Sequence, residues 1–91
     1  MNQTVCNNQP PSILLVDIPY QRNGTTRVLL YRGEDARQVY AGRDLSLSTI
    51  EYATEQAVSD CRPQLTLVTG AHAEVIADNL RAKGCPAIHH R

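Results

Sequence analysis

Two aliphatic segments near the start of the chain predict neighbouring strands. Residues 13–18 read Ile-Leu-Leu-Val-Asp-Ile, residues 27–31 read Arg-Val-Leu-Leu-Tyr, and Asn23-Gly24 lies between them. Because Asn-Gly accepts positive φ at both central positions of a tight turn, the pattern predicts an antiparallel hairpin with a two-residue turn. Residues 36–41 follow a Gly-Glu-Asp turn and are a weaker candidate for a third strand.

Residues 48–61 show the periodicity of an amphipathic helix. Ser48-Thr49-Ile50-Glu51 matches a capping box, in which the Ser and Glu side chains satisfy free amides at a helix start. Arg62-Pro63 then ends the helix. The apolar residues at helical spacing are predicted to face the core: Ile50, Ala53, Ala57, Val58 and Cys61.

The last third of the chain predicts a strand, a helix and a short strand. Residues 64–69 have the composition of a buried strand, and Gly70 ends it. A helix follows over about residues 71–83, with Gly84 suited to its carboxyl end, and residues 87–89 form the last strand. The inward face of this helix is predicted to hold Ala73, Ile76, Ala77 and Leu80.

The order of these elements is β-β-(β)-α-β-α-β, which predicts a single two-layer α+β or α/β domain over residues 12–91. Connections between parallel strands are nearly always right-handed, and successive right-handed crossovers in one direction place their helices on the same side. We therefore expect both helices on one face of a mixed sheet with four or five strands. Residues 1–11 are rich in Asn, Gln and Pro and are predicted to form a flexible N-terminal arm.

Composition narrows the classes of protein that fit. Leu, Ile and Val contribute 9 + 5 + 7 = 21 of 91 residues, and Phe and Trp are absent, so the core must be aliphatic. Nine Lys and Arg balance nine Asp and Glu, which excludes a bulk polycation. The three cysteines are odd in number and far apart, and neither a basic, apolar leader nor a membrane-length apolar run is present. The expected location is cytoplasmic, with no membrane contact.

The segment from Ser48 to Ile88 resembles the large polyvalent protein-associated domains of relaxases and other mobile-element proteins. The residues that carry the resemblance are the Ala-bearing first helix, Leu65-Thr66-Leu67-Val68-Thr69-Gly70, and the second helix closing with Lys83-Gly84-Cys85-Pro86. It covers 41 of the 91 residues. The resemblance implies a phage, plasmid or other mobile element as the source, and it transfers no functional residue.

Catalytic and metal-binding motifs are not found in the sequence. Cysteine and histidine pairs lack the short spacing of structural zinc sites, and no G-x-S-x-G elbow is present. We therefore expect no catalytic residue, no metal and no cofactor. One alternative is a small enzyme or anion-binding domain at Thr69, Gly70 and His72, because the free amides at a helix N-terminus favour anions.

A second alternative is a nucleic-acid-binding accessory protein. Residues 20–44 carry five arginines against three acidic residues, a net charge of 5 − 3 = +2. Arginines pair with phosphates and tyrosines stack on bases. The candidate residues of this class are Tyr20, Arg22, Arg27, Arg37, Tyr40 and Arg43.

The predicted hairpin register indicates where a protein partner binds. In a two-residue turn Arg22 pairs with Thr25, and both faces of the hairpin become largely apolar. A sheet face that the helices leave bare then presents an apolar patch typical of an interface. The predicted partner-binding residues are Ile13, Leu15, Val28 and Leu30, with Asp17 and Arg32 at the polar margin.

The leading functional hypothesis is a small non-enzymatic interaction module that binds another protein or a second copy of itself. A monomer in which the N-terminal arm or a helix covers the same face is the competing structural hypothesis.

Overall fold

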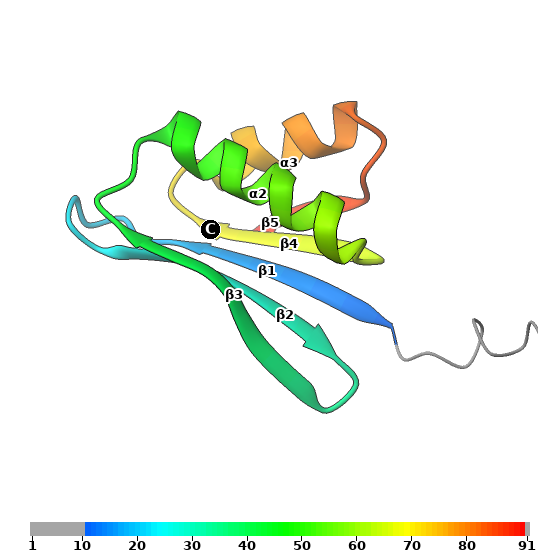
Figure 1. Cartoon of the computed structure of the whole chain (residues 1–91). Helices are drawn as coiled ribbons and strands as arrows, with labels where there is room; N and C mark the ends of the chain where they lie inside the picture. The colour runs from blue at the N-terminus through cyan, green and yellow to red at the C-terminus, as the bar shows by residue number, and fades with distance from the viewer. Residues whose placement is uncertain (1–10, 91) are drawn as a thin grey trace, which may run out of the picture.

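Five strands and two helices follow one another in the computed structural model, which describes residues 11–90. The strands are β1 (Ser12–Ile18), β2 (Thr25–Arg32), β3 (Asp35–Arg43), β4 (Leu65–Gly70) and β5 (Ala87–His90), and the helices are α2 (Leu47–Cys61) and α3 (Ala73–Ala82). Figure 1 shows α2 and α3 side by side on one face of the sheet. The predicted two-layer domain is confirmed, and residues 36–41 belong to a strand. Residues 1–10 of the predicted arm lie outside the described residues.

The sheet is mixed, with strand order β3-β2-β1-β4-β5. β2 is antiparallel to both β1 and β3, whereas β1, β4 and β5 pair in parallel. The connections through α2 and α3 therefore join strands that run in the same direction. No helix in the described part of the chain is long and apolar enough to cross a membrane.

The hydrophobic core lies between the helices and one face of the sheet, which we call the helix-covered face. Leu14, Val16 and Val68 have no exposed surface, and they lie on the two central parallel strands. The predicted inward stripe of α3 is confirmed, because Ala73, Ile76, Ala77 and Leu80 are all buried. Aliphatic side chains thus fill the core.

Polar contacts link α2 and α3 on the outside of the core. Asn79 Nδ2 donates to Glu51 Oε2 at 2.8 Å, and Lys83 pairs with Glu55. Thr54 on α2 is fully buried, and its Oγ1 has no hydrogen-bond partner among the described residues. The sequence periodicity did not predict this buried hydroxyl.

The register of the first hairpin differs from the predicted one. A two-residue turn at Asn23-Gly24 would place Asp17 opposite Leu30, whereas Asp17 lies opposite Arg27. The shift is an odd number of residues, so it moves the β2 side chains to the other face relative to β1. The predicted division of the hairpin into two faces was therefore wrong.

The observed register separates apolar from charged side chains better than the predicted one. It places Val28 and Leu30 beside Val16 and Leu14 on the helix-covered face and keeps Arg27 on the opposite face. β1 ends before Pro19, which has no N–H to donate to a ladder. Residues 19–24 form a wider connection, in which the Gly24 N–H donates to the Gln21 carbonyl oxygen at 3.2 Å.

A two-residue turn occurs instead between β2 and β3. Arg32 pairs with Asp35, which leaves Gly33 and Glu34 as the turn residues, and Gly33 has a φ of 62°. A glycine with positive φ at the first central position is the requirement of a type II′ turn, which matches the twist of the flanking strands.

The helix starts also differ from the predicted ones. The N-cap of α2 is Ser46 rather than Ser48, since Ser46 Oγ accepts a hydrogen bond from the Thr49 N–H at 3.3 Å. The predicted capping box at Ser48 was therefore wrong by two residues. α3 begins at Ala73 after His72, which has a φ of 59° and makes no side-chain capping bond.

Candidate functional site

The sheet face opposite the helices, which we call the open face, carries two rows of apolar side chains. One row crosses the sheet as Tyr31, Ile13 and Leu65, and the other crosses it as Leu29, Leu15, Leu67 and Ile88. Members of a row lie directly opposite one another on neighbouring strands, so their side chains contact each other. We call these seven residues the apolar patch.

The apolar patch is accessible in this structure. Tyr31, Ile13 and Ile88 are 41%, 40% and 49% exposed, and the four leucines of the patch are half-buried by their neighbours. Isolated apolar residues are common on protein surfaces, but contiguous patches mark interaction sites. The contiguity of the two rows is therefore the informative feature.

A polar row borders the apolar patch toward the carboxyl end of β1. It consists of Arg27, Asp17, Thr69 and His90, again directly opposite one another across the strands. Thr69 Oγ1 donates a hydrogen bond to Asp17 Oδ1 at 3.1 Å, which orients the carboxylate. The open face thus has the apolar centre and polar margin that protein interfaces show.

The predicted partner-binding residues divide between the two faces. Ile13, Leu15 and Asp17 lie on the open face, whereas Val28 and Leu30 are buried in the core at 1% and 3% exposure. Because core residues cannot reach a partner, that part of the prediction was wrong. Arg32 is exposed beside the β2–β3 turn, in register with Leu30 and Val28 rather than with the open face.

Sequence reasoning missed five members of the apolar patch. With Arg22 opposite Thr25, as predicted, Leu29 and Tyr31 would share a face with Leu14 and Val16, away from Ile13 and Leu15. Leu65, Leu67 and Ile88 were not assigned to any face. The alternation of Thr66 and Val68 with Leu65 and Leu67 is the signal for a strand that is apolar on both sides.

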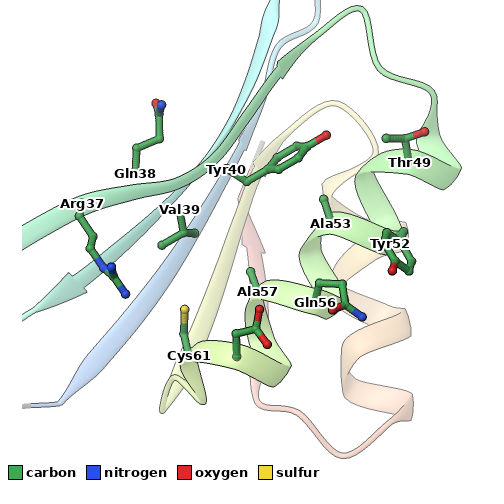
Figure 2. A pocket seen from close by; sticks show the side chains of 11 residues that line it. Arg37, Gln38, Val39, Tyr40, Thr49, Tyr52, Ala53, Gln56, Ala57 and Cys61 are labelled. Carbon is green, nitrogen blue, oxygen red and sulfur yellow. The ribbon is translucent and has the colours of Figure 1, made fainter.

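A groove of about 620 Å³ lies between β3 and α2, on the same side of the sheet as the helices. Figure 2 shows Arg37, Val39 and Tyr40 pointing from β3 to the side on which α2 lies, and Gln38 pointing away. A β-bulge interrupts the pairing of β2 with β3 between Val28 and Leu29. Because bulges increase local twist, the end of the β2–β3 hairpin bends away from α2 (Figure 1).

The helix side of this groove carries both polar and apolar side chains. Thr49, Tyr52, Gln56 and Asp60 recur at helical spacing along α2, and Ala53 and Ala57 lie between them. Tyr52 is 66% exposed. The groove mixes hydroxyl, amide and charged groups with apolar side chains, whereas the centre of the open face is continuously apolar.

The predicted nucleic-acid-binding residues do not form one surface. Arg27 and Arg43 lie in open-face register, and Arg37 and Tyr40 line the β3–α2 groove. Tyr20 and Arg22 belong to the connection between β1 and β2. The nucleic-acid-binding role stays a prediction, and these three locations provide no single track for a strand.

The predicted anion site is not assembled either. Thr69 belongs to the open face and donates to the Asp17 carboxylate, which repels anions, whereas His72 lies beyond the strand at the start of α3. Gly70 has a backbone role, because a Cβ there would lie 1.8 Å from the Ile18 carbonyl oxygen. That oxygen accepts a hydrogen bond from the Ala71 N–H at 3.1 Å.

Metal-ligating residue types are dispersed in the described part of the chain. Over residues 11–90, no three His, Cys, Asp or Glu side chains gather closely enough to hold a metal ion. The thiols of Cys61 and Cys85 are free and half-buried.

Comparisons with known proteins identify the fold and no family. No protein-family model matches the sequence, and no curated protein matches it. The crystal structure of the Thermoplasma acidophilum Pelota protein is similar, with a TM-score of 0.63 and 12% sequence identity. The match covers 90% of this chain and 28% of the Pelota chain, so this chain corresponds to about a quarter of that protein. The likeness concerns the fold alone, and the resemblance to the large polyvalent protein-associated domains stays a prediction.

Proposed function

We propose that this chain is a protein-interaction module and that the open face is its docking surface. The observation that supports this most directly is the apolar patch, in which seven side chains form two continuous rows across the sheet. The helices lie on the other face, so nothing in the described part of the chain covers the patch.

The partner that fits this surface is another protein with an apolar face. Burial of apolar area contributes about 25 cal/mol per Å², and this contribution does not depend on a charged ligand. A polyanion such as nucleic acid would gain little from the apolar rows and would meet Asp17 beside Arg27 in the polar row. The surface chemistry therefore favours a protein over a nucleic acid.

Substitution of Leu15 by Asp tests the proposed function, because Leu15 has patch residues on both neighbouring strands, Leu29 and Leu67. We expect the fluorescence of a hydrophobic dye bound to the full-length chain to fall several-fold in Leu15→Asp. Proteins retained from native-host extract by the immobilised wild type should also be lost.

Val75→Asp provides the matched control. Val75 is 45% exposed on α3, outside the apolar patch, so the same chemical change there should leave dye fluorescence and retained proteins unchanged. Circular dichroism and urea unfolding verify that both variants are folded. Equal dye binding by wild type and folded Leu15→Asp would contradict the proposed docking surface.

A further inference from the structure

We infer that the occupant of the open face is a second copy of this chain, related by a two-fold axis parallel to the strands and located between β1 and β2. This inference rests on the proposed function of the open face as a docking surface. In such a two-fold interface each contact occurs twice, so the surface must complement itself. The arrangement of the polar row and the apolar patch meets that condition.

The polar row selects the direction of the axis. An axis parallel to the strands keeps each row over the same row of the other copy. An axis across the strands reverses the order of the rows. When it passes through the apolar patch, it places Asp17 and Arg27 either over an apolar row, where a charge without a partner is strongly unfavourable, or outside the contact. An axis parallel to the strands keeps the polar rows within the contact and places them over each other.

The charges in the polar row select the position of the axis. Centred on β1, the axis would place the Asp17 carboxylates of the two copies against each other, and like charges repel. Centred between β1 and β4, the axis would place Asp17 over Thr69 and Arg27 over His90 and would pair no opposite charges. Centred between β1 and β2, it exchanges these two strands, so Arg27 of each copy lies over Asp17 of the other. Packed sheets are about 10 Å apart, a distance that Arg and Asp side chains together can span.

Both charged groups are available for this contact. Asp17 and Arg27 are exposed, and neither forms an ion pair within residues 11–90. The hydrogen bond from Thr69 occupies Oδ1 of Asp17, and Oδ2 has no partner among the described residues. The interface would contain two equivalent Asp17–Arg27 ion pairs.

The same axis brings apolar residues together. Leu15 of one copy lies over Leu29 of the other, and Ile13 lies over Tyr31. β4 then lies over β3, which places Leu65 over Ala36 and Leu67 over Gln38, and Ile88 on β5 lies outside the contact. Cross-strand neighbours within one copy thus become contacts between the two copies.

The area of the contact predicts a weak dimer. Four overlapping strands, each about 4.8 Å wide and about 23 Å long, cover on the order of 450 Å² per copy. Stable interfaces typically bury about 800 Å² per partner. The association should therefore be reversible and visible only at high concentration, so the experiment requires a concentration series.

Sedimentation equilibrium of the full chain from about 10 to about 500 µM tests the inference. The mass of the wild type should rise with concentration from 10.1 kDa toward twice that value. Asp17→Arg and Arg27→Asp should each weaken self-association at least tenfold, because each places like charges in contact twice. An equimolar mixture of the two variants should associate, and so should the double variant, because both restore opposite charges.

Arg32→Asp and Asp35→Arg are matched controls. These residues are also exposed cross-strand partners, but they lie beside the β2–β3 turn and outside the proposed contact. Both variants should self-associate like the wild type. Urea midpoints verify that every variant is folded, which matters because Asp17→Arg removes the hydrogen bond from Thr69.

Three results would overturn the second copy as the occupant: a wild type that stays monomeric over the whole series, single variants that associate as the wild type does, or a mixture that associates no better than its components. These failures are distinguishable from failure of the proposed function. If the wild type is monomeric but Leu15→Asp still abolishes dye and protein binding, the open face is a docking surface for a different protein.

Discussion

The two faces of the sheet carry similar aliphatic residues but differ in how far those residues are buried. Leu14 and Leu15 are consecutive in β1, yet Leu14 has no exposed surface on the helix-covered face and Leu15 is half-buried on the open face. The difference does not come from the hydrophobicity of the side chains. It comes from the direction of the chain connections, which place both α2 and α3 on one face.

This comparison shows how a core differs from an interface in a small domain. The helix-covered face has Val28, Val16 and Val68 in register and also encloses Thr26 and Thr66, whereas the open face adds a row with charged side chains beside its apolar rows. Charged groups are tolerated on the open face because they remain in contact with water. A polar margin beside an apolar strand pattern therefore indicates a face that meets a partner rather than the protein's own core.

The largest expected effect on folding stability is at the carboxyl ends of β1 and β4, where the two strands lie side by side. Both faces of the sheet depend on this pairing. Gly70 has a φ of 94°, and an added Cβ would lie 1.8 Å from the Ile18 carbonyl oxygen. We expect Gly70→Ala to destabilise the fold by more than about 4 kcal/mol or to prevent folding, as measured by urea unfolding.

Gly84→Ala is the control for Gly70→Ala. Its φ of 84° is equally unusual for alanine, but nothing lies within 4 Å of the added Cβ. The expected loss is only about 1 kcal/mol, from backbone strain alone. Similar losses for the two variants would mean that the close approach at Gly70 is absent in solution.

The comparison of the two faces is tested most directly by truncating neighbouring leucines. Leu14→Ala should destabilise the monomer by about 3 kcal/mol, because it leaves a cavity in the core. Leu15→Ala should destabilise it by about 1 kcal/mol or less, because water can occupy the space. Urea midpoints at low micromolar concentration measure both without interference from association. Equal losses would indicate that the open face is also covered within one chain.

A smaller effect on folding stability tests the residue at which α2 begins. Ser46→Ala removes the acceptor for the Thr49 N–H and should cost about 1 kcal/mol. Ser48→Ala should cost less than about 0.5 kcal/mol, since its Oγ contacts only Ser46 Oγ, at 3.2 Å. The reverse ranking in thermal or urea unfolding would support the capping box at Ser48.

The smallest expected effect is a stabilisation. Thr54 Oγ1 is buried without a partner, so Thr54→Val exchanges this hydroxyl for a methyl group of similar size. We expect a gain of about 0.5 to 1 kcal/mol in unfolding free energy. Thr54→Ser keeps the hydroxyl, removes the methyl group and should destabilise the helix-covered face by about 1 kcal/mol. A loss of stability in Thr54→Val would show that the hydroxyl has a partner in solution.

Local sequence patterns were sufficient to predict the strands and helices and the buried face of α3. The stripe Ala73, Ile76, Ala77 and Leu80 follows the helical period closely enough that its burial could be predicted without coordinates. The order of strands and helices, together with the handedness of crossovers, was sufficient to place both helices on one face. These features depend on neighbours along the chain or on general rules of chirality.

The candidate site depends on pairing between strands, and there local patterns were misleading. Asn23-Gly24 has the composition of a two-residue turn, but that turn would place Arg27 beside Leu14, Val16 and Ile18 on the helix-covered face. A turn preference contributes little energy compared with the burial of an aliphatic face against two helices. Burial therefore set the register, and the register moved Leu29 and Tyr31 to the open face.

The amino-acid sequence by itself determined which segments are strands and helices, that the core is aliphatic and that both faces of the first hairpin are apolar. Only the tertiary structure decided which apolar residues are enclosed and which form a surface. The physical reason is the two-residue period of a strand, because one odd shift in register exchanges the faces of every side chain on it. Local preferences along the chain differ little between such registers, and the packing of the helices against one face decides between them.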